Sequence, residues 1–464
     1  MAGIGFELRR LIDSRTIRGF VGAAFSGTLI VAGPWLVSTA SIAAIQRLPF
    51  LTGSAAAEFT GAMVWVFALS LCLTTGPLYV FVRHSADLVY ERRHGEAAML
   101  LIKTAALVAA VSLPAGWLLS LALVASVASA GLFRLGFALL FAAVNVLWAA
   151  MMTATVMRRP TRILGAYAFG MALMYALARL LGPGHGSAGA LIAAGAGFAL
   201  TAALLVAMTV SSLGLVPYKG ALRELGGYLR RYGNLAAAGA AYAIGIWVDK
   251  IVLWFVIGSA APGTRFLSYS PYDTAFYYAN LALIPGLIFY TLFTETDFHL
   301  DLTRFLVFAA HRQQPDIERA RSHLARNAAA ALRRQLLFQF VIAAILALMA
   351  PELCALWGVA VQPFLVLIAA GILQLSYVSA LNMLFYLELY RDAARSAFIL
   401  LATNVIVSLV LALGRGQWAV LPDGLSFFLA NGLAAIVALR SAFAGLGRYD
   451  RLLFLRASGQ EYGL

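Results

Sequence analysis

The sequence predicts an all-α polytopic membrane protein with about 12 transmembrane helices, arranged as two six-helix bundles around a central cavity. Hydrophobic residues make up 62% of the 464 positions and charged residues only 12%, which is typical of a chain surrounded largely by lipid. Twelve apolar segments approach the roughly 20 residues that a helix needs to cross a bilayer. The basic residues collect in alternate connections between these segments, as expected of a multi-pass protein.

The apolar segments follow one another along the whole chain. The first run follows four arginines and is too long for the core of a cleavable signal peptide, so we interpret it as the first span. The ninth segment is the shortest. The predicted spans lie near residues 20–45, 59–82, 104–127, 134–157, 163–182, 188–214, 234–258, 274–294, 335–351, 363–390, 397–414 and 424–446.

The positions of the lysines and arginines predict the orientation. With both termini in the cytoplasm, 28 of the 34 basic residues fall on the inner side, five fall on the outer side, and Lys250 alone lies deep within a span. This asymmetry follows the positive-inside rule. Because the basic residues are spread over seven inner segments and do not form one patch with interleaved aromatic residues, the net charge of +14 does not indicate nucleic-acid binding.

A basic segment in the middle of the chain divides the spans into two equal sets. We expect a six-helix bundle over residues 1–216, a cytoplasmic basic linker over 217–233, and a second bundle over 234–464 with a long cytoplasmic loop near 298–334. The lead-in ELRRLIDSRTIRG before the first span resembles ALRELGGYLRRYG before the seventh. This similarity is consistent with a parallel duplication, a known plan of transporters that bind substrate between the repeats.

Two opposite charges interrupt the seventh span. Asp249 lies about 15 residues into the segment, roughly 22 Å from its cytoplasmic end at 1.5 Å per residue, and Lys250 follows it directly. Charged side chains within spans are costly and usually face a bundle interior or a water-filled cavity. Since neighbouring residues of a helix point about 100° apart, each is expected to need its own partner. They are candidates for a transport path, and the alternative is a structural ion pair that joins two helices.

The eighth segment, from Tyr269 to Asp301, carries aromatic residues at its outer end and acidic residues at its inner end. Tyr277 and Tyr278 are suited to stack on sugar rings, although an interfacial aromatic belt is the commoner cause of such a cluster. The acidic residues are suited to attract a cation or a basic partner loop, and the alternative is a solvated helix end.

Glycine and proline are adjacent within several spans, as at Gly33-Pro34 and Pro285-Gly286. A proline bends a helix and frees carbonyl oxygens, which can coordinate a cation or mark a hinge, and packing alone also tolerates such kinks. The residues that we place on a hypothetical substrate or ion path are Gly33, Pro34, Trp35, Trp247, Asp249, Lys250, Asp273, Tyr277, Tyr278, Pro285, Glu295 and Asp297.

A stripe of arginines lies between the eighth and ninth spans. Arg319, Arg326 and either Arg333 or Arg334 recur at near-helical spacing, and Pro315 before them suits the first turn of a helix. Such a stripe is suited to hold anionic lipid or to dock a cytoplasmic partner. The alternative is an orientation signal that happens to be helical.

Several classes of function lack the residues they need. The chain has no GxxxxGK[ST] loop for ATP, and its six histidines lie in the predicted loops or at the ends of spans. Cys72 and Cys354 form neither a metal-binding pattern nor a disulfide framework. No nucleophile has an evident base and orienting partner, so a membrane enzyme is disfavoured and no metal or cofactor is predicted.

Short strings of residues connect the chain to a known family. The opening MAGIGFELRR, the AGPW at Ala32, and YDTAF followed by IPG and ETDF resemble the PelG family, the inner-membrane transporters of the Pel exopolysaccharide system. The resemblance runs from the first residue through about Phe298. This chain has Ala32 where the family has a serine before Gly-Pro-Trp, so a hydroxyl role at that position is not expected.

The resemblance implies a member of the multidrug, oligosaccharidyl-lipid and polysaccharide exporter superfamily in a bacterial inner membrane. Its relatives have twelve helices in two bundles, with the first and seventh lining the cavity, and are usually driven by a Na+ or H+ gradient. The implied substrate is a polymer rich in amino sugars. The implied partners are a cytoplasmic glycosyltransferase and membrane proteins that respond to cyclic di-GMP.

The residues and the resemblance meet at the seventh span. We expect Asp249 to contact a coupling cation or an amino sugar, and Lys250 to tune the charge of Asp249. Two alternatives to a polysaccharide exporter remain open: a flippase for lipid-linked oligosaccharides or small molecules, and a scaffold subunit that assembles a synthase without transporting anything.

Overall fold

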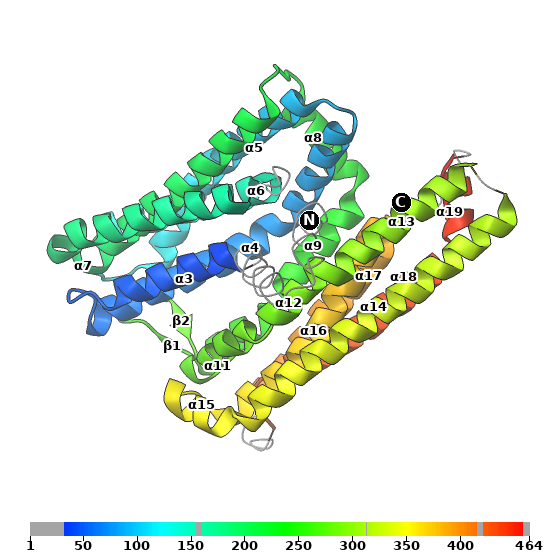
Figure 1. Cartoon of the computed structure of the whole chain (residues 1–464). Coiled ribbons are helices and arrows are strands. Elements are labelled where there is room, and N and C mark those ends of the chain that lie inside the picture. Colours follow the sequence, from blue (N-terminus) through cyan, green and yellow to red (C-terminus); the bar gives the residue numbers. More distant parts are fainter. Residues whose placement is uncertain (1–31, 155–159, 312, 415–420, 458–464) are drawn as a thin grey trace, which may run out of the picture. The chain divides into compact units, whose positions relative to one another are not determined.

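The computed structural model describes residues 32–154, 160–311, 313–414 and 421–457, and these are almost entirely helical (Figure 1). They divide into two compact units. We call Ala32–Arg231 together with Ile257–Ser268 the N-terminal unit, and Tyr232–Val256 together with the described residues of Tyr269–Leu464 the C-terminal unit. The motif MAGIGFELRR and the first part of the first predicted span lie outside the described residues.

The N-terminal unit holds the described parts of the first six predicted spans. The longest element, α7, covers two of these spans, because Gly186 inside it has φ 55° and ψ −130° and so breaks the helix. Its helices are α3 (Gly33–Gln46), α4 (Gly53–Tyr90), α5 (His94–Leu123), α6 (Ala130–Ala154), α7 (Pro160–Leu213) and α8 (Ala221–Arg231).

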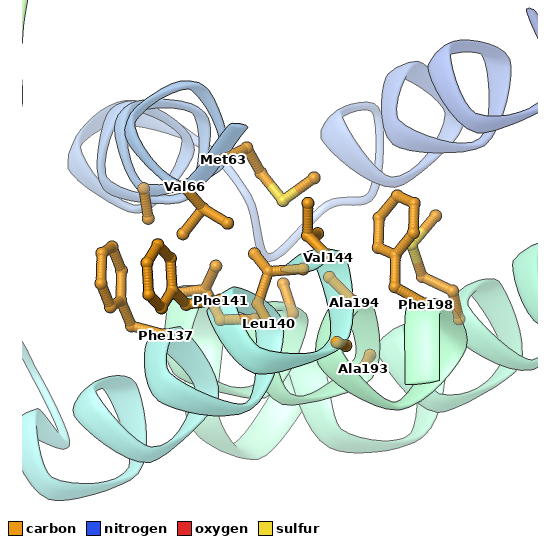
Figure 2. Close-up of a cluster of buried hydrophobic side chains, with 14 of the residues drawn as sticks. Met63, Val66, Phe137, Leu140, Phe141, Val144, Ala193, Ala194 and Phe198 are labelled. Carbon is orange, nitrogen blue, oxygen red and sulfur yellow. The ribbon is translucent and has the colours of Figure 1, made fainter. Parts of the chain in front are cut away.

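Side chains from α4, α6 and α7 form the core of this unit (Figure 2). Phe137, Leu140 and Val144 of α6 are fully buried in it. Small residues let the two halves of α7 approach each other closely: a Cβ at Gly170 would lie 2.6 Å from the carbonyl oxygen of Gly197. Such contacts are typical of helices packed within a bilayer, where close backbone approach replaces the hydrophobic driving force.

A short hairpin from later in the sequence completes the N-terminal unit. Strands β1 (Ser259–Ala260) and β2 (Leu267–Ser268) pair antiparallel. Phe266, beside β2, is fully buried and stacks on Phe137 with ring centroids 5.7 Å apart. Trp65 donates to the carbonyl oxygen of Leu267 at 2.9 Å.

The C-terminal unit holds the remaining six predicted spans. Two of them are interrupted: the seventh bends by 41° between α9 and α10, and the eighth is divided into α11, α12, a π-helical turn at Tyr290–Thr294, and α13. Its helices are α9 (Gly233–Gly245), α10 (Val248–Ile257), α11 (Ser270–Leu281), α12 (Ile284–Phe289), α13 (Glu295–His311), α14 (Gln314–Leu348), α15 (Ala350–Trp357), α16 (Val361–Tyr386), α17 (Tyr390–Leu413), α18 (Leu425–Leu446) and α19 (Tyr449–Ala457).

These helices confirm the prediction of an all-α polytopic membrane protein. Within the described part of the chain, nine helices are long and apolar enough to cross a membrane, and ten if the bent pair α9 and α10 forms one span. The broken α7 accounts for two predicted spans, and α3 is the described part of the first.

The segment 298–334, expected as a long cytoplasmic loop with a helical stripe of arginines after Pro315, is helical through nearly all of its length, since α13 and α14 continue through it. Pro315 in the first turn of α14 suits a helix start, and Leu324 of α14 is buried in the same cluster as Phe305 of α13. The physical reason is that a long polar connection becomes helical when one of its faces is apolar and has a neighbouring helix to pack against.

Candidate functional site

The acid and base of the seventh span lie at its bend. α9 ends at Gly245, α10 begins at Val248, and Asp249 and Lys250 stand in the first turn of α10. Both side chains are buried, with 1% of Asp249 and 3% of Lys250 exposed. A helix break leaves carbonyl oxygens without intrahelical partners. Here Asn404 of α17 donates to the carbonyl oxygen of Gly245 at 2.8 Å.

Asp249 is held by a tyrosine of the next span. The hydroxyl of Tyr272, on α11, donates to Asp249 Oδ2, and both side chains are fully buried. Asp249 Oδ1 lies 3.6 Å from Lys250 Nζ and accepts no hydrogen bond from any described residue. The position of the carboxylate at the N-terminal end of α10 is also favourable, because the helix dipole is positive there.

Lys250 sits in a pocket of aromatic faces. Its Nζ lies 3.3 Å from the ring centre of Phe276 on α11, 4.8 Å from that of Trp247, and 5.9 Å from that of Phe427 on α18. It also donates to the carbonyl oxygen of Ile246, at the bend, at 2.9 Å. Each desolvated contact of an ammonium with an aromatic face contributes up to about 2 kcal/mol. The surroundings of the Lys250 ammonium therefore stabilise a positive charge.

Asp273 of α11 forms a second set of hydrogen bonds between α10 and α11. Trp254 of α10 donates its ring N–H to both carboxylate oxygens of Asp273, at 3.0 and 2.9 Å, and the backbone N–H of Tyr269 donates at 2.9 Å. Of the predicted path residues, the structure thus brings Trp247, Asp249 and Lys250 into one cluster. Asp273 adjoins this cluster, because Trp254, which donates to Asp273, contacts Trp247 with ring centroids 6.3 Å apart.

The eighth span is interrupted at the predicted Pro285. α11 ends at Leu281, α12 begins one residue before the proline, and Gln339 of α14 donates to the carbonyl oxygen of Ala282 at 3.0 Å. A side chain from a neighbouring helix therefore satisfies a backbone group at the break, as the bilayer requires.

Glu295 follows the π-helical turn and is buried, with 6% exposed. The Tyr386 hydroxyl, on α16, donates to Glu295 Oε1 at 2.9 Å. The alternative of a solvated helix end is therefore wrong for Glu295. π-helical turns are frequent at functional sites, so this carboxylate forms a second candidate centre in the C-terminal unit.

The remaining acids and arginines of this region lie on α13 and α14. Asp297 is partly exposed and lies 3.5 Å from Arg334. Arg319 lies 3.4 Å from Asp316. The four arginines predicted for partner docking are all exposed on α14: Arg319, Arg326, Arg333 and Arg334.

The other predicted residues lie elsewhere. Gly33 and Pro34 are buried in the first turn of α3, and Trp35 beside them is half-exposed. Tyr278 stacks on Trp357 of α15 with ring centroids 4.3 Å apart, so one of its faces is already covered. The proposed stacking of sugars on Tyr277 and Tyr278 stays a prediction.

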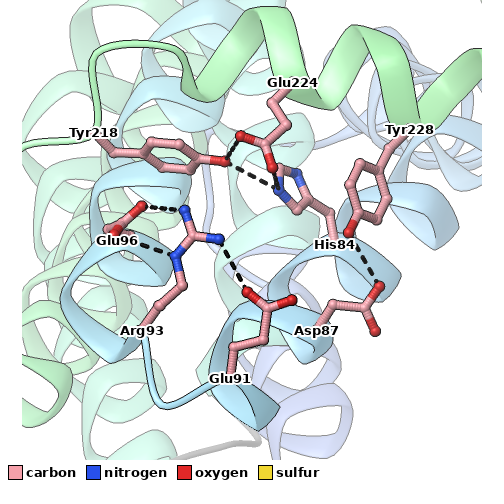
Figure 3. A network of polar contacts seen from close by, with 8 residues as sticks. All are labelled: His84, Asp87, Glu91, Arg93, Glu96, Tyr218, Glu224 and Tyr228. Carbon is pink, nitrogen blue, oxygen red and sulfur yellow. Dashed lines mark hydrogen bonds and ion pairs between the residues drawn. The ribbon is translucent and has the colours of Figure 1, made fainter.

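A polar network that the sequence did not predict lies in the N-terminal unit, where α8 packs on the end of α4 (Figure 3). Tyr228 of α8 stacks on the fully buried ring of His84, with centroids 4.1 Å apart, and its hydroxyl donates to Asp87 at 3.2 Å. The hydroxyl of Tyr218 donates to Glu224 and lies 3.3 Å from His84 Nε2. Burial and the Glu224 contact raise the pKa of Tyr218.

Arg93 extends this network. It contacts Glu91 at 2.9 Å and Glu96 at 2.6 Å, and its guanidinium lies 5.6 Å from the ring centre of Tyr218. The network fixes the basic linker helix to the end of α4 and the start of α5, and its residues come from two segments that are distant in sequence, 84–96 and 218–228.

Comparisons with known proteins identify the family of the chain. A model of the PelG family, described as an exopolysaccharide exporter (EPS-E), matches residues 1–453. The chain belongs to the PelG family of exopolysaccharide exporters. A comparison with curated proteins returned no match.

Solved transporter structures share the fold of this PelG-family chain. A MOP superfamily transporter from Pyrococcus furiosus has a TM-score of 0.57 at 14% identity, covering 97% of this chain and 94% of its own. A MATE structure in the straight conformation gives 0.60 at 14% identity, covering 92% and 94%. A MATE structure in the bent conformation gives 0.59 at 15% identity, covering 97% and 98%. The chain is a multi-pass membrane protein with the fold of MOP-superfamily transporters.

Proposed function

We propose that this PelG-family chain exports a Pel-type polysaccharide, rich in amino sugars, across the bacterial inner membrane for the biofilm matrix. In this proposal it works with a cytoplasmic glycosyltransferase and with membrane partners that respond to cyclic di-GMP, and both of its termini face the cytoplasm. The observation that carries the proposal is the pair of buried charges, Asp249 and Lys250, at the bend of a membrane-spanning helix in a protein of an exporter family.

The cluster is suited to transport because its charges are costly where they stand. Taking a carboxylate and an ammonium out of water costs several kcal/mol each, and their mutual attraction offsets this only in part. Asp249 Oδ1 has no hydrogen-bond donor among the described residues, so an incoming donor would gain a full charge-assisted bond there. An ammonium or hydroxyl group of an amino sugar is such a donor. A coupling H+ would instead protonate the carboxylate, and a coupling Na+ would be coordinated by its oxygen.

The aromatic faces around Lys250 are suited to contact either a cation or a sugar ring. Phe276, Trp247 and Phe427 present π-surfaces that accept either an ammonium or the C–H face of a sugar ring. In the proposed cycle the Lys250 ammonium holds the site closed, and substrate or cation exchanges with it at Asp249. A tethered cation of this kind keeps the buried carboxylate neutralised between transport events.

Polymer secretion by cells that carry single substitutions tests this proposal. Asp249→Asn and Lys250→Met are expected to abolish secretion at protein levels matched to the wild type. Asp316→Asn is the matched control, because Asp316 is a partly exposed acid on α14 outside the cluster. Secretion at the wild-type rate by Asp249→Asn would refute a role for this carboxylate in export.

Purified protein in liposomes separates export from the alternatives. Movement of labelled polymer by this chain, stimulated by a proton or sodium gradient, supports a transporter coupled to that cation. Movement of lipid-linked oligosaccharide without polymer identifies a flippase. Assembly with the synthase partners in the absence of any flux identifies a scaffold. Reporter fusions at both ends of the chain test the proposed cytoplasmic termini.

A further inference from the structure

A cavity lies between α13 and α14 of the C-terminal unit, at the end of the spans where basic residues gather. Its volume is about 610 Å³. The lining comes from one face of each helix and contains three arginines and two aspartates: Asp297, Leu300, Asp301, Arg304, Asn327, Ala330, Arg333 and Arg334.

The face of α14 that lines the cavity continues as an apolar stripe. Positions 330, 333, 334, 337 and 341 follow each other at helical spacing and are all exposed. The stripe changes from arginine to aliphatic side chains between Arg334 and Leu337, which is 59% exposed, and continues with Val341, 54% exposed. Exposed aliphatic residues on a membrane-spanning helix face lipid, so this change marks the level of the headgroups.

The charges of the cavity are not balanced. Arg304 lies 3.6 Å from Asp301 and Arg334 lies 3.5 Å from Asp297, so two arginines have carboxylate partners. Arg333 has no acidic partner among the described residues. The lining therefore carries one net positive charge, and a ligand with a single negative charge would neutralise it.

We propose that this cavity binds the headgroup of an anionic phospholipid from the leaflet on the basic side of the membrane, with one acyl chain lying along Leu337 and Val341. Arg333 and Arg334 contact the phosphodiester, since guanidinium groups bind phosphate oxygens in a bidentate geometry. The aspartates hold the neighbouring arginines in position and accept hydrogen bonds from headgroup hydroxyls.

The stripe favours a lipid over a soluble ligand or a protein. A free phosphate would gain nothing from Leu337 and Val341, whereas a phospholipid contacts both parts of the surface at once. A cytoplasmic protein would have to leave the water phase to reach the aliphatic residues directly next to the arginines. The continuity from charge to apolar surface matches the two parts of a phospholipid.

Native mass spectrometry of the full-length protein in detergent tests the proposal. The probes are phosphatidylglycerol and phosphatidylcholine with identical acyl chains. Each basic residue near a headgroup contributes a factor of roughly five in affinity, so Arg333→Ala/Arg334→Ala is expected to bind phosphatidylglycerol about 30-fold more weakly. Arg395→Ala is the matched control, since Arg395 is exposed on α17 and does not line the cavity, and its affinity should stay within about two-fold of the wild type.

Two further measurements keep the result unambiguous. Arg333→Lys/Arg334→Lys retains the charge and should recover most of the binding, which separates headgroup recognition from misfolding. Glycerophosphoglycerol, the headgroup without acyl chains, should bind far more weakly than the lipid. Equal binding of lipid and free headgroup, equal loss in Arg395→Ala and the double variant, or equal affinity for the two lipids would overturn the proposal. Capture of a protein partner by the wild type that is lost in the double variant would assign the arginines to protein docking and would also overturn it.

Discussion

The stability of the Asp249–Lys250 pair can be tested separately from its function by removing one charge and then both. Asp249→Asn keeps an acceptor for the Tyr272 hydroxyl but leaves the Lys250 ammonium buried without its counter-charge, 3.6 Å away in the wild type. Breaking a buried pair in this way costs about 3–5 kcal/mol. The carbonyl of Ile246 and the aromatic rings still contact the ammonium, so we expect a loss of about 3 kcal/mol, at the low end of that range.

Adding Lys250→Met should restore much of this loss. A pair replaced by uncharged side chains of similar volume is often neutral in stability, so the double variant should lie within about 1 kcal/mol of the wild type. The measurement is thermal unfolding of purified variants in one detergent. Asp316→Asn is the control and is expected to cost less than about 0.5 kcal/mol, because it removes only a solvent-screened ion pair with Arg319 at a partly exposed site. A double variant less stable than Asp249→Asn alone would refute the assignment of Lys250 as the uncompensated charge.

The same double variant decides between the two interpretations of the pair. If Asp249 and Lys250 only join α10 to α11 and α18, a stable double variant should secrete polymer as the wild type does. If they take part in transport, secretion should be lost although the protein is folded. Stability and secretion are therefore measured on the same preparations.

Three other predictions concern positions outside this pair. Gly170→Ala should destabilise the protein by about 1–3 kcal/mol, because the added Cβ would overlap the backbone and a side chain of the facing half of α7. Gly165→Ala is the control: it has open space around it and should be neutral or slightly stabilising, and scanning fluorimetry compares the two variants. Tyr386→Phe should cost about 1–2 kcal/mol, since it removes the donor to the buried Glu295, and a drop in secretion beyond the change in protein level would place Glu295 on the transport path. The raised pKa of Tyr218 means that the folded state favours the neutral hydroxyl, so the stability that Tyr218 contributes is complete below its ordinary pKa of 10.0 and is lost as the pH rises above that value. The temperature of unfolding, measured from neutral to alkaline pH, should therefore fall less steeply in Tyr218→Phe than in the wild type. An identical pH profile in the two proteins would contradict this.

Much of the fold was predictable because membrane-spanning helices leave a strong signal in sequence. Long apolar runs predicted twelve spans, and helices lie in each of these segments within the described residues, nine of them, or ten with the bent pair, being long and apolar enough to cross a membrane. Local breaks were predicted only where proline marks them. Pro285 identified the interruption of the eighth span, whereas the bend between Gly245 and Val248 has no proline and was not expected.

The candidate site was predictable in its charges but not in its partners. Asp249 and Lys250 are conspicuous because ionised groups are rare in spans. Tyr272 is one of several aromatic residues at the outer end of the eighth segment, and nothing in the sequence connects it with Asp249 or connects Phe427, on α18, with Lys250. The network around His84 was missed for the same reason, since side-chain contacts between distant segments depend on packing that composition does not encode.

The start of α11 shows how a short connection bears on this site. Tyr269 directly precedes α11, and its backbone N–H donates to Asp273 in the first turn of that helix. Trp254 of α10 donates its ring N–H to the same carboxylate, so Asp273 joins the start of α11 to α10. Asp249 of α10 accepts the hydrogen bond from Tyr272 of α11 only a short way along the same two helices. A change at Asp273 that shifts α11 relative to α10 must therefore also act on the buried acid and its tyrosine.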